Sequence, residues 1–224
     1  MSEERAKALR NWHDRAHEAA RAALPARMLF MGLELYIAED VFAPHGDEVG
    51  DPFHQAVANE VRPSDRVLDM GTGSGVSGIL AARAGADVVA VDVNPKSVEC
   101  ARGNAAANGV ADRVTFVVGD VFDGVEGDFD LIVFDPPFRW FQPRDLLETG
   151  TADEDYRALS RFMGEAKAHL RPGGRVLLNF GTSGDIDYLY ELIDRARFTK
   201  EVIPYGEATR DGMTARYYTI KLTA

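Results

Sequence analysis

The sequence predicts a doubly wound α/β fold with a mostly parallel seven-stranded sheet, an antiparallel last strand and an N-terminal helical segment. Short valine-rich apolar runs recur along the chain, helical patterns lie between most of them, and a glycine-rich turn follows the first run. With 224 residues, 46% of them hydrophobic, the chain can bury one large core. We therefore expect one α/β domain over residues 41–224, preceded by a helical or extended segment over residues 1–40.

The expected elements alternate along the chain. The strands are expected at Val67–Met70, Val88–Asp92, Val114–Val118, Leu131–Asp135, Val176–Phe180, Lys200–Pro204 and Ala215–Leu222. The helices are expected at Ser74–Ala84, Pro95–Asn108, Tyr156–Leu170 and Ile186–Arg197. Because no helical pattern separates the last two strands, they should form an antiparallel hairpin that turns around residues 206–212. Arg171-Pro172-Gly173-Gly174 is expected as a turn before the fifth strand.

The first 30 residues form an alanine-rich segment that looks helical as far as Leu24-Pro25. Its basic residues are Arg5, Lys7, Arg10, Arg15, Arg21 and Arg27, and its acidic residues are Glu3, Glu4, Asp14 and Glu18. Two interpretations remain: a cap that presents Trp12 and arginines to a substrate, or an ordinary solvated helix packed on the domain. His13 and His17 are four residues apart, but without further ligands we expect no metal site.

A strand ending in Asp69 runs into the glycine-rich turn Gly71-Thr72-Gly73-Ser74-Gly75. A dinucleotide site typically has the pattern G-x-G-x-x-G. Counted from Gly71, the third glycine comes one residue early and Val76 occupies its position. The carboxylate of Asp69 would also repel a pyrophosphate, whereas it suits a ligand with an ammonium and a sulfonium. S-adenosylmethionine is such a ligand, and we expect it to bind at this turn.

The next two strands end in further carboxylates. Asp92 lies where a βαβ unit holds a ribose, so it should accept both ribose hydrogen bonds, with Val93 beside it in the cofactor site. Asp120 follows the third strand, where its carboxylate can meet the adenine amino group while Val121 contacts the ring face. The carboxyl ends of parallel strands share one sheet edge, so these residues should surround one cofactor.

The fourth strand ends in Asp135-Pro136-Pro137-Phe138, a motif suited to holding a planar nitrogen. An amide or aryl amino nitrogen has a delocalised lone pair, so an enzyme must hold it in line with the methyl group. The carboxylate of Asp135 and the carbonyl of Pro136 can accept its hydrogens, and the prolines, Pro136 and Pro137, stiffen the turn. Phe138 offers a flat face for stacking. The alternative interpretation is a plain strand end.

With these signals in register, the chain from about Val41 to the C-terminus resembles a Rossmann-type S-adenosylmethionine-dependent methyltransferase. Asp135-Pro136-Pro137-Phe138 resembles the (Asn/Asp)-Pro-Pro-(Tyr/Phe) motif of enzymes that methylate planar amino groups. These include the HemK-like glutamine methyltransferases of release factors and several base amino methyltransferases of RNA and DNA. Val41-Phe42-Ala43-Pro44 resembles a segment that precedes the first strand in HemK-like and small-domain methyltransferases. The resemblance implies methyl transfer to an amide or amino nitrogen.

The acceptor stays open among a protein glutamine, a nucleic-acid base and a small-molecule amine. Glutamine methyltransferases usually have Asn where this chain has Asp135 and Tyr where it has Phe138. The net charge of −11 argues against broad attraction to a phosphate backbone. Two functions of other classes also remain: a non-catalytic cofactor-binding subunit that serves a partner enzyme, and a dinucleotide oxidoreductase.

Composition points to a cytoplasmic enzyme. Cys100 is the one cysteine, which predicts no disulfide, no cysteine–metal site and no cysteine nucleophile for carbon methylation. We expect no membrane span and no signal peptide, because the apolar runs are too short. After Phe138, the polar loop 139–155 is placed to line an acceptor pocket, where Trp140 and Phe141 serve either the substrate or the anchoring of the loop.

Overall fold

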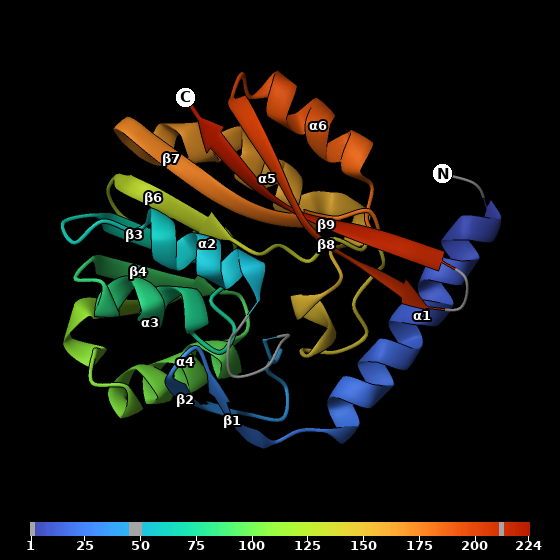
Figure 1. The fold of residues 1–224 in the computed structure, drawn as a ribbon, viewed down its shortest axis with the longest axis horizontal. Helices are drawn as coiled ribbons and strands as arrows, with labels where there is room; N and C mark the ends of the chain where they lie inside the picture. The colour runs from blue at the N-terminus through green and yellow to red at the C-terminus, as the bar shows by residue number, and fades with distance from the viewer. Residues whose placement is uncertain (1–2, 45–50, 211–212) are drawn as a thin grey trace.

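A computed structural model describes residues 3–44, 51–210 and 213–224, which form a twisted sheet covered by helices on both faces (Figure 1). The helices are α1 (Glu3–Ala22), α2 (Pro52–Glu60), α3 (Val76–Arg83), α4 (Pro95–Ala107), α5 (Arg157–Glu165) and α6 (Ile186–Arg195). The strands are β1 (Ala26–Phe30), β2 (Leu33–Ile37), β3 (Arg66–Met70), β4 (Asp87–Asp92), β5 (Val114–Val118), β6 (Phe129–Phe134), β7 (Leu170–Gly181), β8 (Thr199–Arg210) and β9 (Met213–Thr223).

The main sheet has seven strands in the order β5-β4-β3-β6-β7-β9-β8. β3, β4, β5, β6 and β7 pair in parallel, whereas β9 runs antiparallel to both of its neighbours. The predicted fold class is therefore confirmed. Chain order reverses beside β3, where β4 lies on one side and β6 on the other. In such sheets the carboxyl ends at the reversal point form the ligand-binding crevice.

Side chains of the buried strands alternate between two apolar layers. On one face, Leu68 and Val89 pack in the cluster that contains α5 and α6. On the other face, Val67 and Val88 pack in the cluster that contains α2, α3 and α4. This alternation follows from the two-residue period of a strand, and burial of both faces explains why the strands read as continuous apolar runs.

The segment after α1 forms an antiparallel hairpin, β1–β2, which the sequence did not reveal as strands. Phe30, Leu33 and Ile37 are buried in the same apolar layer as α3 and α4. The side chain of Asn104 on α4 also accepts a hydrogen bond from the Tyr36 N–H (2.8 Å) and donates one to the Tyr36 carbonyl (2.9 Å). Residues 26–37 are thus built into the α/β body, because their short strands are stabilised by contacts distant in sequence.

The structure corrects several expected element bounds. β8 and β9 remain paired from Gly206 opposite Tyr217 to Arg210 opposite Met213, so residues 206–210 are strand and not turn. The helix expected over residues 156–170 is shorter: α5 ends at Glu165 and a 3-10 turn follows. Residues 171–174, expected as a turn, lie within β7 beside a register shift in its pairing with β6. α2, with Asp51 as its N-cap, was not predicted.

Helix α1 runs along one end of the sheet, beside the projecting end of β8 and β9 (Figure 1). Leu9 and Trp12 are buried against Ala215 of β9. This contact stabilises the long hairpin where it extends beyond the parallel strands. In the described part of the chain, no helix combines the length and apolar character needed to cross a membrane.

Candidate active site

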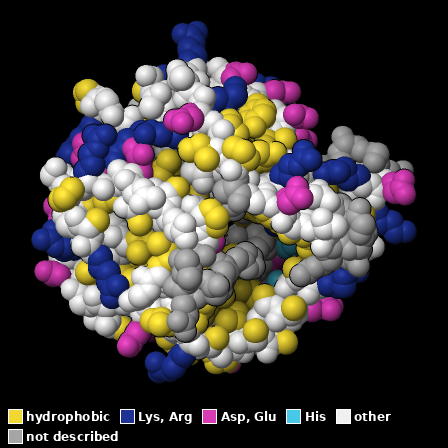
Figure 2. Space-filling view, viewed as in Figure 1, with side chains coloured by type: hydrophobic (Ala, Val, Ile, Leu, Met, Phe, Trp, Pro, Cys, Tyr) yellow, Lys and Arg dark blue, Asp and Glu magenta, His cyan; other side chains and the backbone are white. Residues whose placement is uncertain are grey.

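A cavity of about 690 Å³ lies at the carboxyl ends of β3, β4 and β6. Figure 2 shows a hollow on this face of the molecule, with histidine side chains visible inside it. The cavity is lined by the glycine-rich turn, the ends of β4, β5 and β6, the 139–155 loop and α1. The predicted site residues that line it are Asp69, Gly71, Thr72, Gly73, Asp92, Val93, Asp120, Val121, Asp135, Pro136, Pro137 and Phe138.

Gly75 is the predicted site residue that the structure places outside the cavity lining. It has φ +92° and forms the N-cap of α3. A Cβ added there would lie 3.0 Å from the Cβ of Ala101 on α4. Gly75 therefore allows the turn to pack against α4, and its predicted contact with the cofactor stays a prediction.

Asp69 holds the turn to the helix that follows it. Its Oδ2 accepts hydrogen bonds from the Thr72 hydroxyl (2.6 Å) and the Gly78 N–H (2.9 Å). Burial raises the pKa of Asp69 to about 6, since desolvation penalises the charged form. A Cβ at residue 78 would lie 2.9 Å from the same oxygen, so any larger residue there would displace the carboxylate. Gly73, Gly75 and Gly78 do have G-x-G-x-x-G spacing, a signal that counting from Gly71 missed.

Asp92 forms a second anchor between turn and strand. Its Oδ2 accepts from the Gly73 N–H (2.9 Å) and its Oδ1 from the Asn94 N–H (2.8 Å). Burial raises the pKa of this carboxyl. Asn94 caps α4 by accepting from the Lys96 N–H (2.9 Å), as expected for an N-cap followed by proline. Beside these polar groups, Val93 lines the cavity with 52% of its surface exposed.

Asp120 already has a partner from α5. Its Oδ2 accepts from the guanidinium of Arg157 (2.7 Å), a pairing that the sequence did not reveal because 37 residues separate the two. Val121, which follows it, is buried with φ +54°. The predicted contacts of Asp120 and Val121 with an adenine ring stay predictions.

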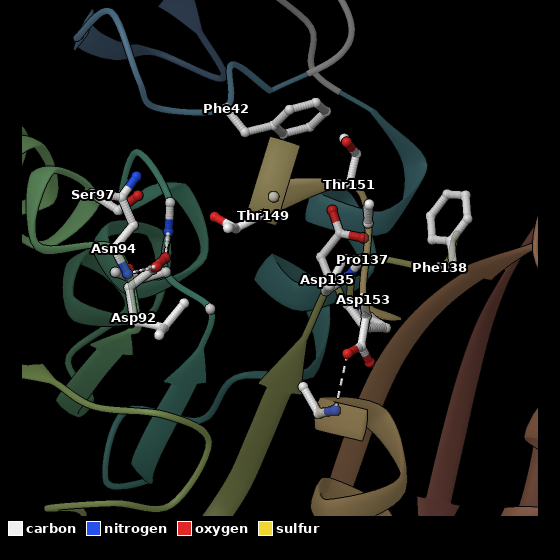
Figure 3. Close-up of a pocket in the computed structure, with 18 of the residues that line it drawn as sticks. Phe42, Asp92, Asn94, Ser97, Asp135, Pro137, Phe138, Thr149, Thr151 and Asp153 are labelled. Atoms are coloured by element: carbon white, nitrogen blue, oxygen red, sulfur yellow. Dashed lines mark hydrogen bonds between the residues drawn. The ribbon is translucent and has the colours of Figure 1, made fainter. Parts of the chain in front are cut away.

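Asp135 lies across the cavity from Asp92 (Figure 3). Its Oδ1 accepts a hydrogen bond from the Asn179 side chain (2.8 Å), which projects from the neighbouring strand β7. Its Oδ2 has no hydrogen-bond partner among residues 3–44, 51–210 and 213–224. Burial raises the pKa of Asp135 to about 6, partly opposed by His54, and Asp51 and Asp69 add to the rise. The carboxylate is thus oriented by one oxygen while the other is available to a ligand.

His54 and Asp51, at the start of α2, were not predicted as site residues. Both line the cavity, and the Asp51 Oδ2 lies 2.8 Å from the His54 Nδ1. Asp51 also caps α2 by accepting from the His54 N–H (2.8 Å). An Asp-Pro pair before a short helical pattern was the sequence signal for this cap.

Phe138 stands beside Asp135 at the cavity wall (Figure 3). Its ring packs at 5.4 Å from the ring of Phe180 and 6.3 Å from that of Tyr217. Its carbonyl accepts from the Tyr156 hydroxyl (3.1 Å), and that hydroxyl in turn accepts from the Asp185 N–H (2.6 Å). The motif is therefore fixed by contacts to β7, β9 and the start of α6.

The 139–155 loop is tied to α1 through a buried carboxylate. Glu148 is 2% exposed, lies 2.7 Å from the His13 Nε2 and accepts from the Arg144 guanidinium at 2.6 Å. These donors hold the pKa of Glu148 near 2 despite its burial. His17 and Arg21 both contact Asp145 in the same way. The two histidines thus have carboxylate partners on the loop.

The cavity is also lined by α1, with Trp12, His13, Ala16, His17 and Ala20. Trp140 and Phe141, the aromatic pair of the 139–155 loop, pack against α1 and each other and do not face the cavity. Phe141 is buried against the ring of His13 (5.4 Å) and lies under the guanidinium of Arg10 (4.1 Å). Trp140 packs on Phe141, and neither belongs to the cavity lining. Of the two interpretations of this pair, the structure favours anchoring of the loop.

Comparisons with known proteins agree with this architecture. The family described as "Methyltransferase small domain" matches residues 38–183, which is more than half of the chain. The release factor glutamine methyltransferase of Cereibacter sphaeroides is 36% identical over 191 residues, covering 74% of this chain and 66% of that protein. The ribosomal protein L11 methyltransferase of an Exiguobacterium species is 49% identical over 80 residues, covering 35% of this chain and 26% of that protein.

Among solved structures, the T. thermophilus 16S rRNA N2 G1207 methyltransferase, in complex with AdoMet and guanosine, superposes with a TM-score of 0.63. It is 23% identical and is covered over 49% of its length, with 88% of this chain matched. At this identity the likeness shows the fold alone. The chain spans less than two thirds of the length of both curated relatives described above.

Proposed function

The chain belongs to the methyltransferase small domain family, and we propose that it is an S-adenosylmethionine-dependent methyltransferase acting on a planar amide or amino nitrogen. One observation carries this proposal: the carboxylate of Asp135, oriented by Asn179, faces the same cavity as the glycine-rich turn and Asp92. The wall that we propose to bind the cofactor and the wall that we propose to hold the amine thus line one cavity.

The residues present fit the cofactor. Gly73 has φ +54°, and a Cβ added there would meet no atom closer than 4.0 Å, so the turn has an open edge where a ligand can approach the backbone. Asp69 and Asp92 suit a cation and a ribose respectively. The exposed side chain of Val93 offers an apolar surface that a planar ring would cover. We propose that these residues, with Thr72, Asp120 and Val121, bind S-adenosylmethionine.

On the acceptor side, Asp135 and the Pro136 carbonyl would accept the two hydrogens of an amide or amino group and so orient its nitrogen. When bound, S-adenosylmethionine supplies an activated methyl group on its sulfonium. Phe138 would stack on the planar group that carries the nitrogen. Since the methyl donor is already activated, positioning can supply most of the rate acceleration.

Three acceptor classes enter this proposal. Similarity to the release factor enzyme of C. sphaeroides supports a protein glutamine as the acceptor. Similarity to the T. thermophilus rRNA enzyme supports a nucleic-acid base. A small-molecule amine is the third class, and the cavity wall formed by α1 favours it, because that helix would act as the cap over the acceptor. We place the enzyme in the cytoplasm, where such acceptors occur. The second candidate function, a non-catalytic cofactor-binding subunit, is opposed by the intact Asp135.

Methyl transfer from radiolabelled S-adenosylmethionine into a lysate of a strain lacking this protein tests the proposal. The labelled lysate is separated into protein, nucleic acid and small molecules, with Asp135→Ala as the inactive control. We expect label in one fraction that is absent with the variant. Tight cofactor binding without label in any fraction would instead support the non-catalytic subunit, and thermal stabilisation by NAD but not by S-adenosylmethionine would support an oxidoreductase.

A further inference from the structure

The basic side chains of the cavity differ in whether they have a carboxylate partner. The histidines and arginines that line it are His13, His17, His54, Arg139 and Arg157. The recorded pairs are His13 with Glu148, His17 with Asp145, His54 with Asp51, and Arg157 with Asp120. In the described ranges, the guanidinium of Arg139 has neither an ion-pair nor a hydrogen-bond partner. Among the described residues, Arg139 is therefore the basic side chain of this cavity whose charge no carboxylate compensates.

The position of Arg139 is well defined. Its backbone bridges to the far side of its loop, with its N–H donating to the Thr151 carbonyl (3.3 Å) and its carbonyl accepting from the Asp153 N–H (2.8 Å). Its guanidinium carbon lies 4.8 Å from the centre of the Phe138 ring. Arg139 is half-buried, and this burial lowers the pKa of its guanidinium. A half-buried cation that is held in place without a carboxylate partner is a strong anion-binding group.

Two buried carboxylates of the loop do not fill this role, because other donors already hold them. Asp153 caps α5, with one oxygen accepting from the Ala158 N–H and the other from the Leu159 N–H, both at 3.0 Å. Glu148 is bound by Arg144 and His13. The groups that face the Arg139 charge are instead the phenols of Tyr156 and Tyr217. Since no described carboxylate forms an ion pair with Arg139, a bound ligand can supply the anion.

We propose that Arg139 binds an oxyanion, a carboxylate or a phosphate, on a small methyl acceptor whose planar amine or amide is held by Asp135. This rests on the proposed function and deepens it by naming the substrate class. Arg139 directly follows the Asp135–Phe138 motif, so the two groups would bind opposite ends of one acceptor across the Phe138 ring. One uncompensated guanidinium matches one oxyanion, whereas a polynucleotide would require a row of cations on a chain of net charge −11.

Matched pairs of probes test this assignment in calorimetric titrations, performed on the full chain with and without saturating S-adenosylhomocysteine. The carboxylate arm compares 4-aminobenzoate with 4-aminobenzamide, and the phosphate arm compares AMP with adenosine. The variants are Arg139→Gln and Arg139→Lys. Arg195→Gln is the control, because that arginine lies exposed on α6 and pairs with Glu191.

For the wild-type protein we expect the acid of at least one pair to bind about tenfold or more tightly than its neutral partner. Arg139→Gln should remove this preference, Arg139→Lys should keep part of it, and Arg195→Gln should leave it unchanged. The pair that shows the preference identifies the oxyanion. Equal affinities within both pairs, a preference that survives in Arg139→Gln, or no binding of either acid at about 10 mM would each overturn the proposal.

Folding and cofactor binding are measured separately. Each variant should keep the melting temperature of the wild type within a few degrees and the same affinity for S-adenosylhomocysteine. If the wild type selects the acid but binds neither S-adenosylhomocysteine nor S-adenosylmethionine, the proposed methyltransferase function fails while the anion site stands. If it binds both cofactor forms but shows no preference for the acid, the anion site fails while the proposed function stands.

Discussion

The two walls of the cavity are built from contacts of very different range. On the cofactor side, Asp69 contacts Thr72 and Gly78, three and nine residues away, and Asp92 contacts Gly73 and Asn94, 19 and two residues away. On the acceptor side, Asp135 is held by Asn179, 44 residues away. Similarly, Glu148 contacts His13 across 135 residues. The contacts of Asp69 and Asp92 are thus mostly local, although Asp120 is paired with Arg157, 37 residues away, whereas the acceptor side is assembled by the tertiary fold.

This difference predicts that substitutions on the two walls separate cofactor affinity from turnover. Asp135→Ala should have the largest effect, lowering kcat about 10³-fold, because it removes an acceptor that orients the reacting nitrogen. The affinity for S-adenosylmethionine, measured by calorimetry, should change by less than about threefold. Turnover close to that of the wild type would contradict the assigned role of Asp135 and with it the division of the cavity into two walls.

Asp92→Ala should show the opposite pattern. The substitution removes the acceptor for the Gly73 N–H together with the predicted ribose contact, so the Kd for S-adenosylmethionine should rise about 30- to 100-fold. At saturating cofactor, kcat should fall much less than in Asp135→Ala. A large loss of kcat with unchanged cofactor affinity would show that Asp92 serves the acceptor side.

One carboxyl on each wall, Asp69 and Asp135, should make the preference for S-adenosylmethionine over S-adenosylhomocysteine depend on pH. Burial raises the pKa values of Asp69 and Asp135 to about 6, so both carboxyls become ionised as the pH rises through 6. Ionised carboxylates favour the sulfonium cation, and the preference for S-adenosylmethionine over S-adenosylhomocysteine should therefore increase about tenfold between pH 5 and 7.5. Titrations at the two pH values measure this ratio. A ratio independent of pH would show that neither carboxyl faces the sulfonium.

The raised pKa values of Asp69 and Asp135 also affect stability: a rise in pH that favours cofactor binding should lower the free energy of unfolding of the cofactor-free protein. Both carboxyls bind a proton more tightly in the folded protein than in the unfolded chain, whose carboxyls have a pKa near 3.8. Their contribution to the free energy of unfolding of the cofactor-free protein is therefore greatest at low pH and decreases as the pH rises from about 4 to about 6. The Asp135→Asn variant should weaken this dependence in thermal unfolding measured across that range.

His13→Gln should have the smallest effect. It weakens the contact between α1 and the 139–155 loop while Arg144 still binds Glu148, so we expect a loss of about 1–2 kcal/mol. For a chain of this size the melting temperature should fall by about 2–8 °C. If α1 caps the acceptor, the KM for the acceptor should rise while cofactor affinity stays the same. An unchanged KM would leave α1 with a packing role only.

Elements whose residues interact locally could be predicted from the sequence. The parallel strands β3, β4, β5 and β6 were predicted within a residue or two, because strands buried on both faces need continuous apolar runs. The helix that begins at Pro95 was also predicted, and its cap by Asn94 involves only residues next to each other in the chain. By contrast, the β1–β2 hairpin depends on Asn104 and on the core beneath it. Its short alternating pattern was too weak to identify alone.

By itself, the amino-acid sequence determined the fold class, the glycine-rich turn and the carboxylates at the strand ends, because each follows from residue type and short-range spacing. Only the tertiary structure decided that Gly75 packs against α4, that Asn179 orients Asp135 and that α1 lines the cavity. It also decided that, of the described basic side chains in the cavity, His13, His17, His54 and Arg157 each meet a carboxylate whereas Arg139 meets none. Which charges pair depends on the distant segments that the fold brings together, so residue spacing along the chain does not predict it.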